Sequence, residues 1–211
     1  MLNCMLNLNF IYSFFTADCD YALTAGSDKS IKLWNPRKGL LLQTFSGHGY
    51  EVMDVRGSCD SSHLASGSLD KCVFFWDVST AQALRRYRGH AGFVNCVQFN
   101  EESTIILSGS VDSTVKAWDC KSQSKEAVQV LDEAKDSVTS IAISNQEIIT
   151  SSLDHCIRTY DLRKGFMHLD NVECKCGLSF FDHLLKIINF FRSSQSCMHH
   201  QRQSMFTCFL S

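Results

Sequence analysis

One stretch of the chain holds a histidine, a serine and an aspartate, the residue types of a nucleophilic hydrolase, together with a tryptophan. These residues are His48, Ser66, Asp70 and Trp76. In such enzymes the histidine activates the serine hydroxyl while the aspartate orients the imidazole ring. The same four types recur 42 residues later (90 − 48 = 42), as His90, Ser108, Asp112 and Trp118. Because a catalyst rarely needs a second triad, we expect neither set to be catalytic.

The spacing of 42 residues extends over most of the chain. Asp70 has counterparts at Asp28, Asp112 and Asp154, since 70 − 28, 112 − 70 and 154 − 112 all equal 42. The tryptophan series runs in the same register, through Trp34, Trp76, Trp118 and Tyr160. A fixed period of this length is typical of a repeat array.

A structural role explains the duplicated set. If each set is buried, the indole N–H, hydroxyl, imidazole and carboxylate satisfy one another, as buried polar groups must. The network would fasten the loop before a repeat's first strand to the turn between its second and third strands, and losing one partner should cost about 1–3 kcal/mol. The fourth repeat should be held less firmly, because its residues at these positions cannot form the network: Asp132, Thr150, Asp154 and Tyr160.

Each repeat reads as four short strands, rich in β-branched and aromatic residues and separated by Gly, Ser and Asp turns. In the second repeat we expect strands at 51–56, 63–67, 72–76 and 82–87. The first repeat predicts strands at 6–15, 21–25, 31–34 and 40–45, the third at 93–98, 104–109, 114–118 and 127–131, and the fourth at 138–143, 147–151 and 156–160. A four-stranded meander of this kind is a propeller blade, so the predicted class is all-β.

Composition bounds the class of protein. With 211 residues, 45% of them hydrophobic and 20% charged, the chain can bury a core and is too apolar to be disordered. A net charge of −2 gives no overall electrostatic reason to bind nucleic acid or an anionic membrane. Residues 1–15 are apolar, but they lack a basic start and alternate at period two, which favours a strand over a signal peptide or a membrane anchor.

The eleven cysteines show no regular disulfide spacing, which favours a reduced chain inside the cell. Cys72 and Cys156 hold equivalent positions, two residues after the turn aspartate, and predict packing rather than redox chemistry. No glycine-rich phosphate loop occurs. The thiols and imidazoles near the end of the sequence are spaced too irregularly for structural zinc: Cys174, Cys176, Cys197, His199, His200 and Cys208. We therefore expect no metal, cofactor or small-molecule substrate.

Arg85, Arg86 and Arg88 form a basic run on an expected outermost strand. Charged residues on the edge of a sheet discourage the addition of further strands, and we favour that interpretation. The alternative is a docking patch for an acidic partner.

Paired residues mark the ends of two repeats: Gly47-His48 with Trp76-Asp77, and Gly89-His90 with Trp118-Asp119. With the Ser-Gly-Ser turns, these pairs make the chain resemble the WD40-repeat family. More narrowly, five segments resemble WD-repeat scaffolds that organise mitogen-activated protein kinase signalling: GSDKSIKLWNP (26–36), SGHGYEV (46–52), RGHAGFVNCVQFNEE (88–102), ILSGSVDS (106–113) and YDLRKG (160–165).

The resemblance implies a seven-bladed propeller that serves as a scaffold in kinase signalling and is also associated with the spliceosome. Seven repeats of this length need roughly 294 residues, so the chain would hold about four of the seven blades. We expect a partial propeller over residues 1–165 and a divergent tail over 166–211. Within the tail, the helical spacing of apolar residues predicts a short helix over 178–191.

We accordingly expect a non-catalytic scaffold or adaptor for protein assembly in mitogen-activated protein kinase signalling, with pre-mRNA splicing complexes as a second setting. The expected partners are kinase-cascade components and, secondly, spliceosomal proteins, rather than nucleic acid or a membrane. The expected location is the cytoplasm, with the nucleus as a second one. Loops at the blade ends would supply the contact residues: Tyr50, Glu51, Leu69, Phe93, Val111 and Leu153.

Two alternatives stay open. Asp154, Tyr160, Asp161 and Arg163 resemble the WD-x-R box of substrate receptors for cullin-based ubiquitin ligases, with a tyrosine in the tryptophan position. Arg163 would then be a contact residue, although capping a strand and binding a nearby carboxylate is the simpler role for it. The other alternative is a non-functional truncated isoform.

Overall fold

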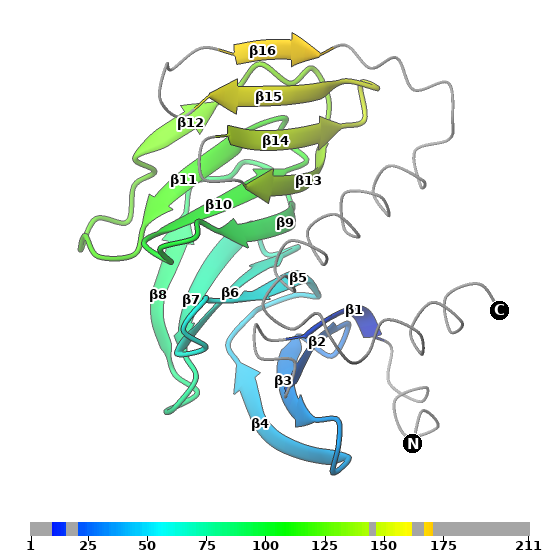
Figure 1. Cartoon of the computed structure of the whole chain (residues 1–211), viewed down its shortest axis with the longest axis vertical. Coiled ribbons are helices and arrows are strands. Elements are labelled where there is room, and N and C mark those ends of the chain that lie inside the picture. Colours follow the sequence, from blue (N-terminus) through cyan, green and yellow to red (C-terminus); the bar gives the residue numbers. More distant parts are fainter. Residues whose placement is uncertain (1–9, 16–20, 144–146, 162–166, 171–211) are drawn as a thin grey trace, which may run out of the picture.

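The computed structural model describes residues 10–15, 21–143, 147–161 and 167–170, and side chains only within 21–143 and 147–160. In this part of the chain every regular element is a strand, and the strands form four antiparallel sheets of four strands each. Figure 1 shows the sheets following one another in an arc, with the chain passing from one to the next in sequence order. The all-β class and the partial propeller are thereby confirmed.

Within each sheet, every strand lies beside the strands that precede and follow it in the chain. The first sheet contains β1 (Phe10–Phe15), β2 (Ala22–Gly26), β3 (Ser30–Asn35) and β4 (Leu40–Ser46). The second contains β5 (Val52–Gly57), β6 (His63–Ser68), β7 (Cys72–Asp77) and β8 (Ala83–Arg88). The third contains β9 (Val94–Phe99), β10 (Ile105–Ser110), β11 (Val115–Asp119) and β12 (Gln129–Leu131), and the fourth β13 (Val138–Ile143), β14 (Glu147–Ser152), β15 (Ile157–Asp161) and β16 (Met167–Asp170).

The turn between the second and third strands has the same construction in all four sheets. The turn aspartate accepts a hydrogen bond from the backbone N–H two residues later, as Asp70 Oδ1 does from Cys72 N at 3.0 Å. The residue between them has a left-handed backbone, with φ of 64° at Lys71. The equivalent residues also have φ of 64–65°: Lys29, Ser113 and His155. Asp tolerates and stabilises such turns through its short acceptor side chain, which explains why the aspartate recurs with the period.

The core lies between neighbouring sheets. In the second, third and fourth sheets the third strand places a large aromatic side chain against the preceding sheet, and Trp76 and Trp118 are almost fully buried there. Phe45 of β4 meets the edge of Trp76 at 5.9 Å between ring centroids, and its repeat equivalent Tyr87 stacks on Trp118 at 5.2 Å. Aromatic contacts of this geometry add to the free energy of apolar burial, so they hold the sheets together in pairs.

Two equivalent glycines, Gly67 and Gly109, lie where neighbouring sheets come close together. A Cβ added to Gly67 would lie 2.5 Å from Val94 Cγ1, and one added to Gly109 would lie 2.6 Å from Val138 Cγ1. Polar bonds also cross between first strands, because Val97 N donates to Asp54 Oδ2 at 3.0 Å and Asn95 Nδ2 donates to Ser137 Oγ at 2.9 Å. Only glycine permits this separation at positions 67 and 109, so the second and third sheets are each fitted closely to the sheet that follows.

The fourth sheet continues further than the sequence indicated. We expected the repeats to end at 165, but β16 pairs with β15 over Ile157↔Asp170 to Tyr160↔Met167. Backbone hydrogen bonds alone can complete a sheet, and they need no repeat motif in the added strand. The predicted helix over 178–191 and the remainder of 171–211 lie outside the described residues. In the described ranges no helix has the length and apolar character needed to span a membrane.

Candidate functional site

The structure brings His48, Ser66, Asp70 and Trp76 together in one hydrogen-bonded set, which we name the histidine network. His48 Nδ1 lies 2.9 Å from Asp70 Oδ2, and His48 Nε2 lies 2.7 Å from Ser66 Oγ. Trp76 Nε1 donates to the same hydroxyl at 2.8 Å. The network joins the loop before β5 to strands β6 and β7 and to the turn between them.

The third sheet repeats the histidine network with nearly the same geometry. His90 Nδ1 lies 3.0 Å from Asp112 Oδ2, His90 Nε2 lies 2.7 Å from Ser108 Oγ, and Trp118 Nε1 lies 2.8 Å from that oxygen. In both sheets the aspartate also accepts a hydrogen bond from the loop backbone, from Gly49 N at 3.0 Å and from Ala91 N at 2.8 Å. The aspartate therefore fixes both the imidazole ring and the loop that carries it.

The two serines have no solvent access. Ser66 and Ser108 are 0% exposed, and each hydroxyl oxygen already meets an indole N–H and an imidazole. A nucleophile must be reached by its substrate and needs a free lone pair for attack. The arrangement therefore has the distances of a catalytic triad, but burial keeps any substrate from reaching the serine hydroxyl.

The glycine before each histidine has a packing reason. A Cβ added to Gly47 would lie 3.0 Å from Trp76 Cη2, and one added to Gly89 would lie 3.0 Å from Trp118 Cη2. The indole ring occupies the space where a side chain would stand. The Gly-His pair thus follows from the close contact between loop and tryptophan.

Electrostatics favour an ionised aspartate in both networks and a neutral His90 in the third sheet. Burial raises the pKa of Asp70, but hydrogen bonds from His48 and from Gly49 N outweigh burial and bring the pKa down to about 2. The pKa of Asp112 is lowered in the same way, against its own burial, by Thr114 and His90. Burial lowers the pKa of His90 more than the nearby Asp112 raises it. A neutral imidazole can donate through Nδ1 to the carboxylate and accept through Nε2 from the serine hydroxyl.

The first and fourth sheets lack the histidine and use a cation instead. In the fourth, Arg158 Nη2 lies 2.6 Å and Nη1 3.2 Å from the two oxygens of Asp154. In the first, Lys32 Nζ lies 2.5 Å from Asp28 Oδ2. Lys32 and Arg158 hold the same repeat position, since 158 − 32 equals three periods of 42. The second and third sheets hold Phe74 and Lys116 at that position. Phe74 packs against the His48 ring, and Lys116 Nζ donates to Gly89 O.

The tryptophan position is satisfied differently in these two sheets as well. Trp34 Nε1 donates to Thr24 Oγ1 at 2.9 Å, so a threonine takes the role of the serine. The Tyr160 hydroxyl donates to Glu133 Oε2 at 3.1 Å, while Asp132, in the histidine position, is exposed. As expected, the fourth sheet does not form the histidine network from its four residues at these positions: Asp132, Thr150, Asp154 and Tyr160. Sequence reasoning missed Arg158, although comparing residues 32, 74, 116 and 158 would have found it.

Hydrogen bonds link the loop residues expected to contact partners. Leu69 N donates to Glu51 O at 3.0 Å, and Val111 N donates to Phe93 O at 2.9 Å. Lys29, from the turn of the first sheet, lies over the Tyr50 ring at 5.5 Å. These contacts place the turn and the loop at the same end of each sheet. We name this end the loop face, defined by Tyr50, Glu51, Leu69, Phe93, Val111 and Leu153.

Large apolar side chains of the loop face are open to solvent. Tyr50 is 62% exposed, Phe93 and Val111 are each 45% exposed, and Leu153 is 36% exposed. Leu69 and Glu51 are half-buried. The apolar members come from the second, third and fourth repeats, so the loop face extends across successive sheets. Arg163, and with it the end of the WD-x-R box, lies outside the described residues.

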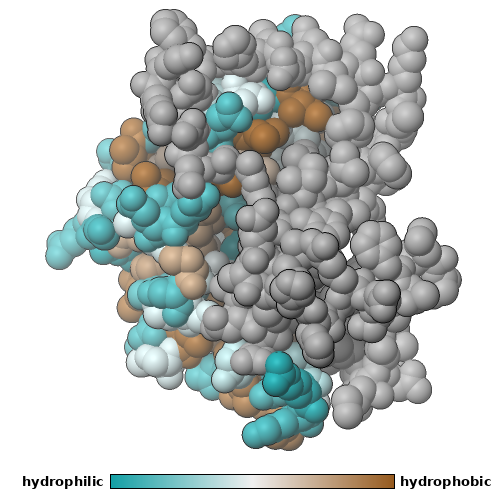
Figure 2. All heavy atoms as spheres, viewed as in Figure 1, coloured by the Kyte–Doolittle hydropathy of each residue, from teal (hydrophilic) through white to brown (hydrophobic). Residues whose placement is uncertain are grey.

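The outer edges of the sheets also expose apolar residues. Leu40, Leu41 and Leu42 of β4 are exposed, as are Val128 and Val130 near β12. In Figure 2, hydrophobic residues appear among hydrophilic ones along this edge of the molecule. The cysteines at 59, 72, 96, 120 and 156 form no disulfide with one another, and burial raises the pKa of Cys120 to about 12. Within the described residues no three His, Cys, Asp or Glu side chains gather as metal ligands, and Cys174 and Cys176 lie outside them.

Comparison with known sequences finds three matched repeats. A family profile described as "WD domain, G-beta repeat" matches residues 6–35, 39–77 and 81–119. WD repeat domain-containing protein 83 of Xenopus tropicalis is 70% identical over 156 residues, which cover 74% of this chain and 50% of the relative. Its namesake from Homo sapiens is 64% identical over 166 residues, covering 77% of this chain and 53% of the relative. A homologue from Dictyostelium discoideum is 37% identical over 179 residues, covering 72% and 55%.

The chain spans about half the length of the curated relatives it matches. Among solved structures, one titled "Structure of U3-55K" superposes with a TM-score of 0.71 at 24% identity. The superposition covers 77% of this chain and 52% of that one. At this identity the likeness supports the fold alone.

Proposed function

Because the chain belongs to the WD40-repeat family, we propose that it is a non-catalytic scaffold whose loop face holds partner proteins. The observation that carries this proposal is the pairing of buried histidine networks with exposed apolar loops. The networks fix the loops before β5 and β9, and the same loops present Tyr50 and Phe93 to solvent. Rigid support with exposed aromatic residues is the arrangement that protein interfaces favour.

Catalysis has no support in the described residues. The serine, histidine and aspartate groups that could perform it are buried and occupied with one another. A second buried copy of the set adds the same loop support to the next sheet. A scaffold needs both copies, because each supports one loop. A hydrolase could use neither copy, because both serines are buried.

The finer role we propose is assembly of kinases of the mitogen-activated protein kinase cascade, with pre-mRNA splicing complexes as a second setting. The proposal rests on the resemblance of segments 46–52, 88–102 and 106–113 to scaffolds of that pathway. These segments contain both network histidines, His48 and His90, and most residues of the loop face. The cytoplasm is the matching location, with the nucleus for the second setting.

The test is a pull-down of purified kinases of this cascade by the immobilised chain. We expect Tyr50→Ala/Phe93→Ala to lose capture, because the double variant removes two exposed aromatic contacts without touching the histidine networks. The matched control is Leu41→Ala/Leu42→Ala, which removes two exposed apolar side chains from the outer strand β4. Equal capture by the wild type and the aromatic double variant would remove the loop face from the proposal.

A further inference from the structure

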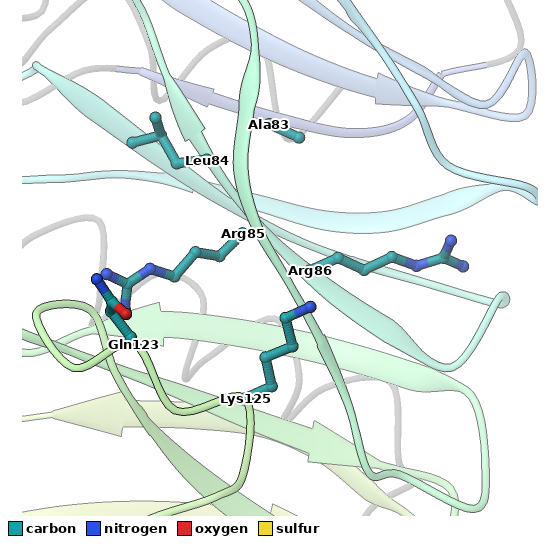
Figure 3. A pocket seen from close by; sticks show the side chains of 6 residues that line it. All are labelled: Ala83, Leu84, Arg85, Arg86, Gln123 and Lys125. Atoms are coloured by element: carbon teal, nitrogen blue, oxygen red, sulfur yellow. The ribbon is translucent and has the colours of Figure 1, made fainter.

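A hollow of 310 Å³ lies between the outer edge of the second sheet and the third sheet. Strand β8 supplies Ala83, Leu84, Arg85 and Arg86, and the connection from β11 to β12 supplies Gln123 and Lys125. We name this hollow the basic groove. Figure 3 shows Arg85 extending over Gln123, Lys125 reaching from its loop toward β8, and Arg86 on the other side of the strand. The groove is thus built by two repeats together.

Arg85 is held in place by backbone carbonyls and not by a carboxylate. Its Nη1 donates to Asp119 O at 3.4 Å and its Nη2 to Lys121 O at 3.3 Å. Both acceptors are backbone carbonyls, which orient the guanidinium and leave its positive charge uncompensated by a paired carboxylate. The carboxylate of Asp119 accepts a hydrogen bond from Lys121 N at 2.7 Å, and the charge of Arg85 contributes to lowering its pKa without a direct ion pair. Arg85 therefore lines the groove as an oriented cation.

Of the other two cations of the groove, Lys125 is free in the described part of the chain and Arg86 is held against its own sheet. Lys125 is exposed and has no ion-pair or hydrogen-bond partner for its ammonium group within the described residues. Arg86 Nε donates to Cys72 Sγ at 3.3 Å, and its guanidinium lies 5.1 Å from the centroid of the Phe74 ring. Its Nη2 is 4.0 Å from Asp70 Oδ2. Glu126 follows Lys125 and is exposed. The groove has an excess of positive charge, although the whole chain has a net charge of −2.

The groove also has an apolar side and an open backbone edge. Leu84 is 49% exposed next to Ala83. Strand β8 pairs with β7 on one side only among the described strands. An extended peptide could run along this edge with an apolar side chain against Leu84 and acidic side chains near Arg85 and Lys125. The six groove residues include no aromatic ring on which a nucleic-acid base would stack.

We propose that the basic groove binds a short acidic segment of a partner protein, in which a leucine or similar residue is flanked by aspartates and glutamates. The sequence offered this basic run as an edge that discourages strand addition or as a docking patch for an acidic partner, and the geometry of the groove favours the second. The groove lies on the outer side of the sheets and uses no residue of the loop face. It adds a second docking surface to the proposed scaffold and stands independently of the first.

The test is fluorescence polarisation with the full chain and a labelled peptide in which one leucine is flanked on both sides by aspartates and glutamates. We expect saturable binding that weakens with added salt. Arg85→Glu/Lys125→Glu should bind roughly tenfold more weakly or worse, the scale of change seen when close charge pairs across an interface are reversed. Lys125→Glu alone should also weaken binding, and its exposed site makes it safe for the fold.

The matched control is Lys38→Glu, an exposed lysine in the β3–β4 connection of the first sheet. It makes the same charge change outside the groove and should leave peptide binding unaltered. Tyr50→Ala/Phe93→Ala should also bind the peptide normally, so loss of the loop-face function and loss of the groove are separate results. If the Lys38→Glu and Lys125→Glu variants bind the peptide equally well, the proposal is overturned. It is also overturned if the wild type binds a single-stranded oligonucleotide as well as it binds the peptide.

Discussion

Two guanidinium nitrogens of Arg158 donate hydrogen bonds to Asp154, at 2.6 and 3.2 Å. They lie in the one described sheet that has an aspartate, Asp132, at the repeat position of the network histidine. Burial raises the pKa of Asp154, but the hydrogen bonds from Arg158 and the loop backbone lower it further than burial raises it. Lys135 N completes the set with a bond to Asp154 at 3.0 Å. The loop before β13 is therefore anchored through Lys135 N to the equivalent aspartate, which is paired with an arginine here instead of a histidine.

Removing this arginine should destabilise the fold. Arg158 is 2% exposed, so Arg158→Met leaves a carboxylate in a mostly buried site without its partner. We expect a loss of about 3 kcal/mol in the free energy of unfolding, measured by urea denaturation. Lys32→Met is the matched control at the same repeat position, where Asp28 is 44% exposed, and it should cost less than about 1 kcal/mol. Similar losses in the two variants would mean that burial of the pair does not decide its contribution.

Removing a network hydroxyl should leave two polar groups unsatisfied. In Ser66→Ala both Trp76 Nε1 and His48 Nε2 lose their partner in a dry site. We expect destabilisation of about 1–3 kcal/mol by urea denaturation, and a similar loss for Ser108→Ala. Ser46→Ala, on exposed β4, should change stability by less than about 0.5 kcal/mol. If Ser66→Ala behaves like Ser46→Ala, the network contributes nothing to holding the loop.

Adding a methyl group between sheets should also be costly. Gly67→Ala places a Cβ at 2.5 Å from Val94 Cγ1 and 3.1 Å from Val97 Cγ1, both on the first strand of the next sheet. Overpacking of this kind costs about 1–3 kcal/mol, which thermal or urea unfolding would detect. Gly49→Ala is the control, because its nearest contact would be Asp70 Cβ at 3.9 Å. A stable Gly67→Ala protein would show that the sheets can move apart without loss.

Stability should fall in two stages as the solution is acidified. The folded pKa of His90 is below its ordinary 6.5, so the unfolded chain binds a proton that the folded chain refuses, and stability declines below about pH 6.5. Asp70 has a folded pKa of about 2 against an ordinary 3.8. Its contribution, on the order of 2 kcal/mol, is complete above the ordinary value and is lost as the pH falls toward about 2. Asp112 and Asp154 add to this second stage.

Urea unfolding at a series of pH values measures both stages. In His90→Gln the decline below about pH 6.5 should become shallower, while the decline at lower pH stays. A curve for His90→Gln that keeps the full upper stage would assign that stage to another group.

The period of 42 residues predicted most of the fold because backbone pairing and turn chemistry repeat with it. Strands expected at 63–67 and 72–76 are observed as His63–Ser68 and Cys72–Asp77. The sequence also predicted that the turn aspartate, the histidine and the tryptophan form a buried hydrogen-bond network. Their spacing places them on a loop, a turn and a strand of the same sheet. Strand Met167–Asp170 escaped prediction, since it joins the sheet through its backbone and carries no repeat signature.

Contacts between repeats were beyond sequence reasoning. The bond from Val97 N to Asp54 and the place of Arg85 against the β11–β12 connection both depend on how neighbouring sheets are set together. Periodicity places a residue within its own sheet but gives no distance to the next one. The basic groove is of this kind, which explains why the sequence offered only a basic run on an edge.

The order of strands in the sheets has a consequence for synthesis on the ribosome. Every strand pairs with its neighbours in sequence, so each sheet closes through short loops that cost little entropy. Contacts between sheets, such as Asp54 with Val97, span 43 residues, about one period. Low separation of contacting residues favours fast folding. Each sheet has all its strands as soon as its own repeat has emerged, so assembly can follow translation from the first repeat onward.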